Sequence, residues 1–329
     1  MNRGRLSSID ALKGFAIIAV LLLHSLNPDI LAAIKSTIHI GQAVPIFALI
    51  TFYLTYLSLE QKGGIIRNYY SADRVKKTSK RIVLPFFMVT SLQCVLLLYM
   101  AHFQPLKLLS GGGYGPGSYY VWIYLQIWVL APLIYSLLKK NEILGTIIVY
   151  TVCIALNILC SYFCPKDLWR LLIVRYLSLS VIAWIWLKYA SLNKRGKGFL
   201  IFLSILSLYY LLYYTHYDAS PFIYPNSWVS QNYPVFFWTL ILVVLCVKLI
   251  PMLPNTIRTV LEWLGVNSWE VFLAQMFFIS CISINRFPKL YSLSVSQILY
   301  VLFVFVMSIG SVFIYDSLRI HFINKKSDD

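Results

Sequence analysis

Long apolar runs follow one another along almost the whole chain, separated by short polar or charged segments. A helix needs about 20 predominantly apolar residues to cross the hydrocarbon core of a bilayer. The pattern therefore predicts about ten transmembrane helices. They lie near residues 10–28, 42–59, 83–103, 119–138, 144–164, 170–187, 199–214, 233–250, 268–286 and 293–316.

No repeat, low-complexity tract or soluble segment separates these runs. The predicted fold class is therefore all-α: one polytopic membrane helical bundle over residues 1–329, with a short cytoplasmic tail at 318–329. Composition agrees, because 59% of the residues are hydrophobic and 12% are charged, against roughly 25% charged in soluble domains. The six cysteines lie in or beside apolar runs without metal-binding spacing. We expect them to pack as small apolar side chains, and we expect no metal.

Positive charge is distributed unevenly between the two sides of this predicted bundle. The 28 Lys and Arg residues against 12 Asp and Glu give a net charge of +16. In short loops of membrane proteins, Lys and Arg remain on the cytoplasmic side. With an inside N-terminus, the outer side and outer span ends hold only Lys35, Lys107, Lys166, Arg170, Arg175, Arg286 and Lys289. We therefore expect cytoplasmic termini, a lipid bilayer as surroundings and no nucleic-acid partner.

Two outer loops are longer than the others, at residues 104–118 and 215–232, and the second has no Lys or Arg. Both are rich in Gly, Pro, Tyr, Ser or Asn. They are either solvated connectors or an aromatic, polar vestibule for a hydroxyl-rich ligand, and composition favours the vestibule. The candidate substrate-binding residues are Gly115, Gly117, Ser118, Tyr119, Tyr120 and Trp122.

Three polar side chains interrupt the first apolar run, where an ionisable group requires a partner or a function. They are Asp10, Lys13 and His24. Lys13 and His24 are roughly 16 Å apart along the helix axis, so His24 lies in the outer half of the span. Gln126 and Arg175 lie at a comparable depth. If these three side chains face the interior, they form a catalytic polar cluster beneath the 104–118 loop; alternatively, His24 only packs and Lys13 snorkels to the surface.

Charged groups also gather near the predicted cytoplasmic mouth. Asp10 and Lys13 are one helical turn apart and can pair, and Glu270 is a second possible partner of Lys13. A structural ion pair explains these residues at least as well as a ligand contact.

A basic segment joins the second and third spans. Its residues Arg67, Arg74, Lys77 and Arg81 follow at steps of 7, 3 and 4, which places them on one helical face. Such a face binds anionic lipid headgroups or the phosphates of a nucleotide-like donor. The residues alone favour the lipid interpretation.

The first span resembles the opening of the acyltransferase-3 family, integral membrane enzymes that O-acylate cell-surface carbohydrates. The family pattern is an Asp, a basic residue followed by Gly, and a His separated from the basic residue by ten others. Here these are Asp10, Lys13–Gly14 and His24. Further similarities lie in Pro45–Ile46–Phe47 through Thr55, in Arg81–Ile82–Val83–Leu84–Pro85, and in the stretch from Leu264 to Gln275.

The chain departs from the family pattern at three places. Lys13 replaces the usual Arg, which keeps the charge but loses the planar guanidinium. Thr51–Phe52–Tyr53 stands where Ser-Gly-Phe is often seen, and Gln275 stands where His is frequent.

The resemblance implies transfer of an acetyl group from acetyl-CoA to a hydroxyl of a surface or lipid-linked carbohydrate in a bacterial inner membrane. His24 is then the general base, and Arg175, Gln126 or loop amides stabilise the oxyanion. Asp10, Glu270 and Gln275 are expected to be structural or tuning residues. The residues expected to hold the CoA end are Lys13, Arg67, Arg74, Lys77 and Arg81.

The main alternative is a transporter or polymerase of polysaccharide or lipid-linked oligosaccharide. Transporters tend to contain internal repeats with broken helices, and the sequence has no such repeat. Polymerases usually carry a long basic outer loop, whereas residues 215–232 contain no Lys or Arg. The sequence therefore favours the acyltransferase.

Overall fold

A computed structural model describes residues 3–217, 229–282 and 294–328. Within these ranges the regular structure is entirely helical. The α-helices are α1 (Arg3–Ser25), α2 (Pro28–Ala33), α3 (Ala43–Gln61), α4 (Ala72–Thr78), α5 (Leu84–Tyr99), α6 (Pro105–Gly111), α7 (Tyr119–Lys140), α8 (Glu142–Phe163), α9 (Lys166–Arg170), α10 (Leu179–Lys188), α11 (Lys194–His216), α12 (Phe236–Leu249), α13 (Asn255–Val266), α14 (Ser268–Ile282) and α15 (Ser294–Asp328). The shorter 3₁₀ or π turns are η1 (Ser36–Ile38), η2 (Ile40–Gln42), η3 (Ile66–Asn68), η4 (Ser79–Val83), η5 (Ile173–Tyr176), η6 (Tyr189–Ser191), η7 (Val229–Gln231), η8 (Tyr233–Val235) and η9 (Ile250–Met252).

The membrane bundle predicted from the sequence is confirmed. In the described ranges, nine helical segments are long and apolar enough to cross a bilayer. The pair α13 and α14 passes the same test together but is bent by 71°, which allows up to ten spans. The predicted ninth span, 268–286, begins with α14, and the sequence did not predict that α13 precedes it at this bend. Residues 283–286 of that span and residues 218–228 of the predicted outer loop at 215–232 lie outside the described residues. The predicted tail at 318–329 continues α15 as helix through Asp328.

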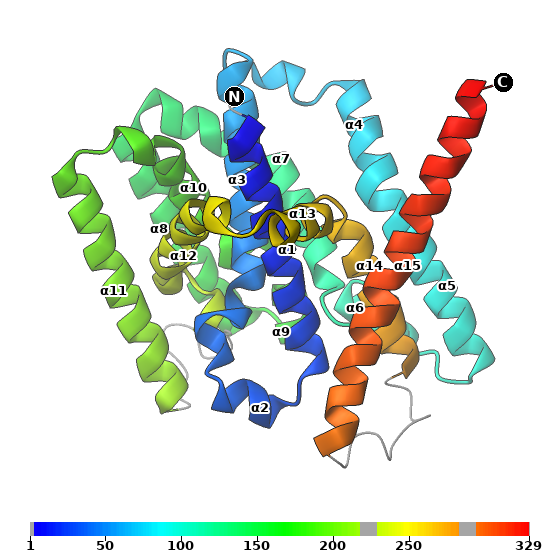
Figure 1. Cartoon of the computed structure of the whole chain (residues 1–329). Coiled ribbons are helices and arrows are strands. Elements are labelled where there is room, and N and C mark those ends of the chain that lie inside the picture. The colour runs from blue at the N-terminus through cyan, green and yellow to red at the C-terminus, as the bar shows by residue number, and fades with distance from the viewer. Residues whose placement is uncertain (1–2, 218–228, 283–293, 329) are drawn as a thin grey trace.

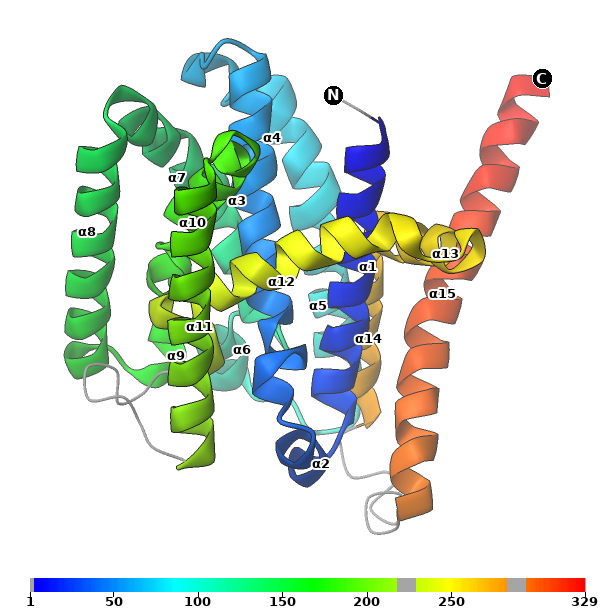
Figure 2. The same cartoon turned by 60° about the vertical axis from the view of Figure 1, so that its left-hand side comes forward.

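The helices surround a central pair, α1 and α3, and α1 begins at the end of the bundle where α15 finishes (Figures 1 and 2). A chain that crosses the bilayer an even number of times begins and ends on the same side, and this arrangement agrees with ten spans. Helices α8 and α11 form one side, and α5 and α15 form the other (Figure 1). Their outward faces are apolar and exposed, as lipid contact requires.

Two glycines allow α13 to cross α1 at backbone contact. A Cβ atom on Gly265 would overlap the carbonyl oxygen of Asp10, and a Cβ atom on Gly14 would overlap the carbonyl oxygen of Leu261. Trp263 then ties α13 to α15, because its indole N–H donates to Asp316 Oδ2 at 3.2 Å. The crossing places the bend between α13 and α14 beside Lys13, at one end of the cavity described below.

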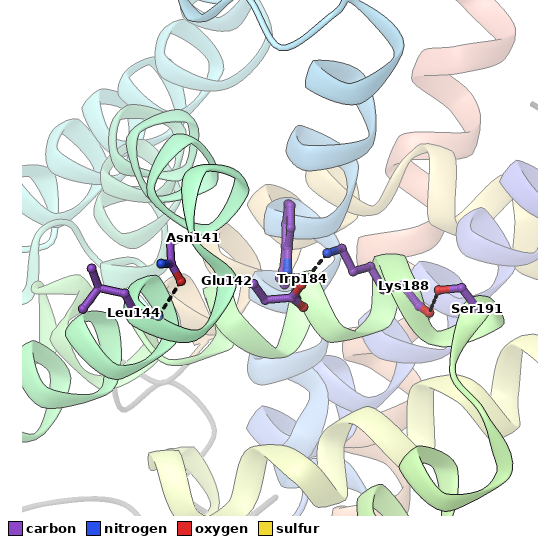
Figure 3. Close-up of polar contacts among 6 residues, drawn as sticks. All are labelled: Asn141, Glu142, Leu144, Trp184, Lys188 and Ser191. Atoms are coloured by element: carbon purple, nitrogen blue, oxygen red, sulfur yellow. Dashed lines mark hydrogen bonds and ion pairs between the residues drawn. The ribbon is translucent and has the colours of Figure 1, made fainter.

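Polar contacts at the α7–α8 corner fix α10 against the bundle. Figure 3 shows Glu142 accepting hydrogen bonds from Trp184 Nε1 at 3.0 Å and from Lys188 Nζ at 2.6 Å. The side chain of Asn141 caps α8 by accepting from the N–H of Leu144 at 3.0 Å. Between these two residues of α10, the Trp186 ring stacks on Tyr53 of α3, with centroids 3.9 Å apart. This stack packs α10 against α3, which forms one wall of the candidate site.

Candidate functional site

A cavity of about 390 Å³ lies between α1, α3, α4, α7 and α14, within the roughly 300–1,000 Å³ range of small-molecule sites. Its lining residues are Lys13, Ile17, Val20, His24, Val44, Phe47, Ile50, Thr51, Leu54, Thr55, Tyr69, Arg74, Thr78, Arg81, Ile82, Gly117, Tyr119, Tyr120, Tyr124, Trp128, Ser268, Trp269 and Phe272. All charged residues of this lining are basic. The cavity extends along α1 from Lys13 to His24, roughly 16 Å.

The basic end of the cavity is built from α1 and from the segment that leads into α5. Lys13 Nζ lies 2.6 Å from Asp10 Oδ1, so the ion pair predicted within α1 forms. Arg74 lies over the ring of Tyr69, with its guanidinium carbon 3.8 Å from the ring centroid. The Tyr69 hydroxyl is 3.2 Å from Thr55 Oγ1. Burial raises the pKa of Tyr69, which keeps the phenol protonated as a hydrogen-bond donor.

Only part of the predicted basic face reaches the cavity. Arg74 and Arg81 line it, whereas Arg67 and Lys77 do not. The prediction of one continuous helical face was wrong because Arg67 lies in the separate turn η3, before α4 begins at Ala72. The π turn η4 also changes the angular position of the residues that follow α4. Pro85, at the start of α5, lacks the N–H that an α-helix would direct to Arg81.

The other end of the cavity places His24 beside the glycine-rich loop. A Cβ atom on Gly117 would lie 3.8 Å from His24 Nε2 and 2.8 Å from Phe272 Cε2. Gly117 has a φ of +84°, a conformation that side chains rarely adopt. The positive φ and the close Phe272 ring therefore exclude a side chain at Gly117, and the backbone of the loop lies next to the imidazole.

The predicted cluster of His24, Gln126 and Arg175 does not form around this cavity, because only His24 lines it. Gln126 Nε2 donates to Leu171 O at 2.6 Å, and Gln126 Oε1 accepts from the Ile173 N–H at 2.9 Å. These two bonds hold the irregular backbone that leads into η5. The sequence placed Gln126 and Arg175 at a depth comparable to that of His24, but depth alone does not decide which cavity a side chain faces.

Arg175 is buried behind the aromatic wall of the cavity, with 1% of its surface exposed. Its guanidinium carbon lies 4.9 Å from the ring centroid of Trp169 and 5.5 Å from that of Tyr119. Arg175 Nη2 also donates to Arg170 O at 3.2 Å. Because Tyr119 itself lines the cavity, Arg175 can act on the site by positioning this ring.

We predict that Gln126→Ala destabilises the protein without removing its activity. The substitution deprives Leu171 O and Ile173 N–H of their side-chain partner, at a cost of about 1–3 kcal/mol. The thermal unfolding midpoint in detergent should therefore fall, while kcat per folded molecule stays within a few-fold of the parent. A drop of about 100-fold in kcat at unchanged stability would instead support the oxyanion role suggested by the sequence.

The candidate substrate-binding residues of the glycine-rich loop separate into three groups. Gly117, Tyr119 and Tyr120 line the inner cavity. Gly115 and Ser118 line a second, outer cavity. Trp122 lines neither cavity, because its indole N–H donates to Gly112 O at 2.8 Å and braces the loop.

Three candidate tuning residues have different positions. Asp10 pairs with Lys13, as described above. Glu270 follows two lining residues, Ser268 and Trp269, but does not line the cavity, and no ion pair joins it to Lys13 in the described part of the chain. Gln275 is fully buried in α14 and also lies away from the cavity lining.

The sequence analysis missed several polar lining residues. Thr51 and Thr55 are four residues apart in α3, which puts both on the cavity side. That spacing of two hydroxyls in an apolar helix was a usable signal. Tyr69 and Trp269 carried no comparable signal, because aromatic residues are frequent throughout the chain.

The family model of the acyltransferase-3 family, described as an acyltransferase domain, matches residues 6–316. No protein of curated function and no solved structure matches the chain. The matched range is nearly the whole chain and includes every lining residue of the inner cavity. The resemblance seen in the first span is thereby confirmed, and the chain belongs to the acyltransferase-3 family.

Proposed function

We propose that this membrane acyltransferase moves an acetyl group from acetyl-CoA to a hydroxyl of a surface or lipid-linked carbohydrate. The observation that carries the proposal is one continuous cavity with basic side chains at one end and His24 at the other. The basic end suits phosphates, and the imidazole suits proton transfer. The membrane acyltransferase family supports the reaction type.

The lining residues suit the two parts of the donor. Lys13, Arg74 and Arg81 are available for the phosphates of the nucleotide end. Apolar side chains such as Ile17, Val20 and others along α1 and α3 line the path to His24. This path suits the extended thiol arm, and it would direct the thioester towards the imidazole.

His24 would act as general base in the transfer. The imidazole accepts the proton of the sugar hydroxyl while the hydroxyl oxygen bonds to the thioester carbonyl carbon. The carbon–sulfur bond then breaks, and the thiolate of CoA leaves with the proton returned from the imidazole. Polar groups beside His24, among them the backbone of the glycine-rich loop, are the candidates for stabilising the oxyanion.

In the route that we propose, donor and acceptor arrive from opposite faces of the membrane. We place the termini and the basic end of the cavity at the cytoplasmic face of a cell inner or plasma membrane, because Lys and Arg are concentrated there. The acceptor then approaches from the side of the 104–118 loop. Labelled acetyl-CoA supplied only to the cytoplasmic face of sealed vesicles should acetylate a glycan outside, and failure would exclude this route.

The function is tested by measuring ester-linked acetate on the surface glycan of cells with and without the protein. Loss of acetate with intact glycan in the deletion strain is the expected result. A truncated or missing glycan whose remaining sugars keep their acetate would contradict the proposal and indicate transport or polymerisation.

We predict that Arg74→Gln and Arg81→Gln each raise KM for acetyl-CoA by about tenfold or more, with a smaller effect on kcat. Each substitution removes one charge-assisted hydrogen bond to phosphate, worth about 1.5–3 kcal/mol. Lys76→Gln is the matched control, because Lys76 is an exposed basic residue of α4 that does not line the cavity. An equal rise in KM for Lys76→Gln would indicate a general effect of surface charge.

A further inference from the structure

The glycine-rich loop separates two cavities. The outer one, of about 630 Å³, is lined by loop residues together with residues of α5, α9 and α14. Gly115 and Pro116 line the outer cavity, Gly117 the inner one, Ser118 the outer one and Tyr119 the inner one. Because neighbouring residues face opposite cavities, a single layer of backbone lies between them.

One face of α14 supports this layer. Phe272, Met276 and Ser280 follow at intervals of four residues, so they lie on the same side of the helix. A Cβ atom on Gly117 would lie 2.8 Å from Phe272 Cε2, and one on Gly115 would lie 2.6 Å from Met276 O. The loop therefore packs on α14 closely enough to exclude any side chain at these two positions.

One buried amide joins the loop to α14. The side chain of Gln93 in α5 is fully buried. Its Nε2 atom lies 3.0 Å from Met276 O, 3.2 Å from Ser280 Oγ and 3.5 Å from Tyr114 O. Gln93 Oε1 is buried and has no hydrogen-bond partner in the described part of the chain. The Gln93 amide thus contacts both the glycine-rich loop and α14.

We propose that residues 115–117 form a barrier between the inner and outer cavities, and that Gln93 is the positioning residue that keeps it closed until the acceptor displaces it. The purpose of the barrier rests on the proposed acetyl transfer. A sugar hydroxyl and water can both attack the thioester; both reactions break the carbon–sulfur bond and release CoA thiol. Attack by the sugar yields an acetyl ester, whereas attack by water yields acetate. The closed barrier excludes water on the outer side from His24.

The outer cavity is the place from which the acceptor approaches. Hydroxyl and amide groups line it, including those of Ser110, Ser118, Ser280 and Gln104. Asp167 and Arg170, which also line it, form an ion pair, with Arg170 Nη1 3.7 Å from Asp167 Oδ1. This lining suits the hydroxyl groups of a carbohydrate, whose entry would move the loop away from α14.

The barrier is tested without any acyl donor by the accessibility of a cysteine in the inner cavity. Thr51 of α3 lines that cavity, and Thr51→Cys introduces a thiol there. A charged, membrane-impermeant thiol reagent is applied to the face of sealed vesicles that bears the 104–118 loop. Adding Gln93→Leu should increase the labelling rate about tenfold, because the amide that bonds to both the loop and α14 is lost. Equal rates with and without Gln93→Leu would overturn the barrier.

Gln42→Leu is the matched control. Gln42 is also fully buried, and its Nε2 donates to Thr37 O at 2.8 Å, away from the glycine-rich loop. It should leave the labelling rate of Thr51→Cys unchanged, and an equal increase would overturn the proposal by indicating general loosening. If Gln93→Leu does not reach the membrane, Ser280→Ala removes one acceptor of the same amide. We then expect a rise of a few-fold, and an unchanged rate would overturn the barrier.

A second measurement separates this proposal from the proposed function. In proteoliposomes supplied with acetyl-CoA and no glycan, Gln93→Leu should increase the release of CoA thiol about tenfold over the parent. In cells, the same variant should lower ester-linked acetate on the glycan. Absence of acetyl transfer by the parent would refute the proposed function and leave the labelling result valid. Normal transfer with unchanged labelling and unchanged thiol release would refute the barrier alone.

Discussion

Replacing His24 with alanine is expected to reduce acetyl transfer by about 10²–10⁴-fold, the usual contribution of a positioned general base. His24 is the one imidazole that lines the inner cavity of the described structure. Without it, the sugar hydroxyl must lose its proton to water or attack while protonated. The decrease should fall on kcat, because Lys13, the basic residue of α1 available for the donor, is roughly 16 Å from His24 along the helix. Ester-linked acetate on the glycan should disappear at matched membrane levels of the protein.

The neighbouring residue supplies the control for this substitution. Ser25→Ala changes the same turn of α1, but Ser25 is buried and donates to Leu21 O at 2.7 Å, away from the cavity lining. Its effect on kcat should be small. Retention of kcat within a few-fold in His24→Ala would contradict the role of base and leave His24 as a packing residue. His24→Gln, which keeps a polar group without a comparable base, should be as inactive as the alanine variant.

Much of the fold was predictable because the bilayer restricts it strongly. A chain in lipid must satisfy its backbone polar groups internally, so apolar runs of sufficient length become helices. The positions of the spans could therefore be predicted, and Lys13 and His24 were identifiable as ionisable residues inside an apolar span. The structure places both in one cavity, together with Arg74 and Arg81. The lengths of the apolar runs and the spacing of charged residues along the chain were enough to single out these four residues.

Rotation about the helix axes was not predictable in the same way. Counting residues from the span ends placed Gln126 and Arg175 at about the depth of His24, but depth does not specify which neighbouring helix a side chain faces. The segment at 170–187 was predicted as one span, yet its beginning contains the turn η5, whose irregular backbone bonds to Gln126. The bend between α13 and α14 was missed because α13 is amphipathic rather than uniformly apolar. Tertiary contacts decided each of these features.

Replacing Gly265 with alanine is expected to prevent normal folding, because the added methyl group lies where two helices are in backbone contact. The new Cβ would overlap the carbonyl oxygen of Asp10, which belongs to the backbone of α1 and cannot rotate away. The helices must separate, and overpacking typically costs about 1–3 kcal/mol. We expect the upper end of this range or more here, because the obstructing atom belongs to the backbone, and this is a large part of the roughly 5–15 kcal/mol stability typical of proteins. The amount of monodisperse protein extracted in mild detergent should fall sharply.

Gly198→Ala is the matched control, because it is the same substitution in a helix that no other helix of the described structure contacts at that position. Gly198 lies within α11, and a Cβ atom there meets nothing within 4 Å. Alanine in a helix interior is favoured over glycine by about 0.5–1 kcal/mol, so this variant should unfold at the same or a slightly higher temperature. Normal yield and stability of Gly265→Ala would contradict the backbone contact between α1 and α13. Because this contact also sets Lys13 beside the α13–α14 bend, any Gly265→Ala protein that survives should bind acetyl-CoA more weakly while keeping His24 in place.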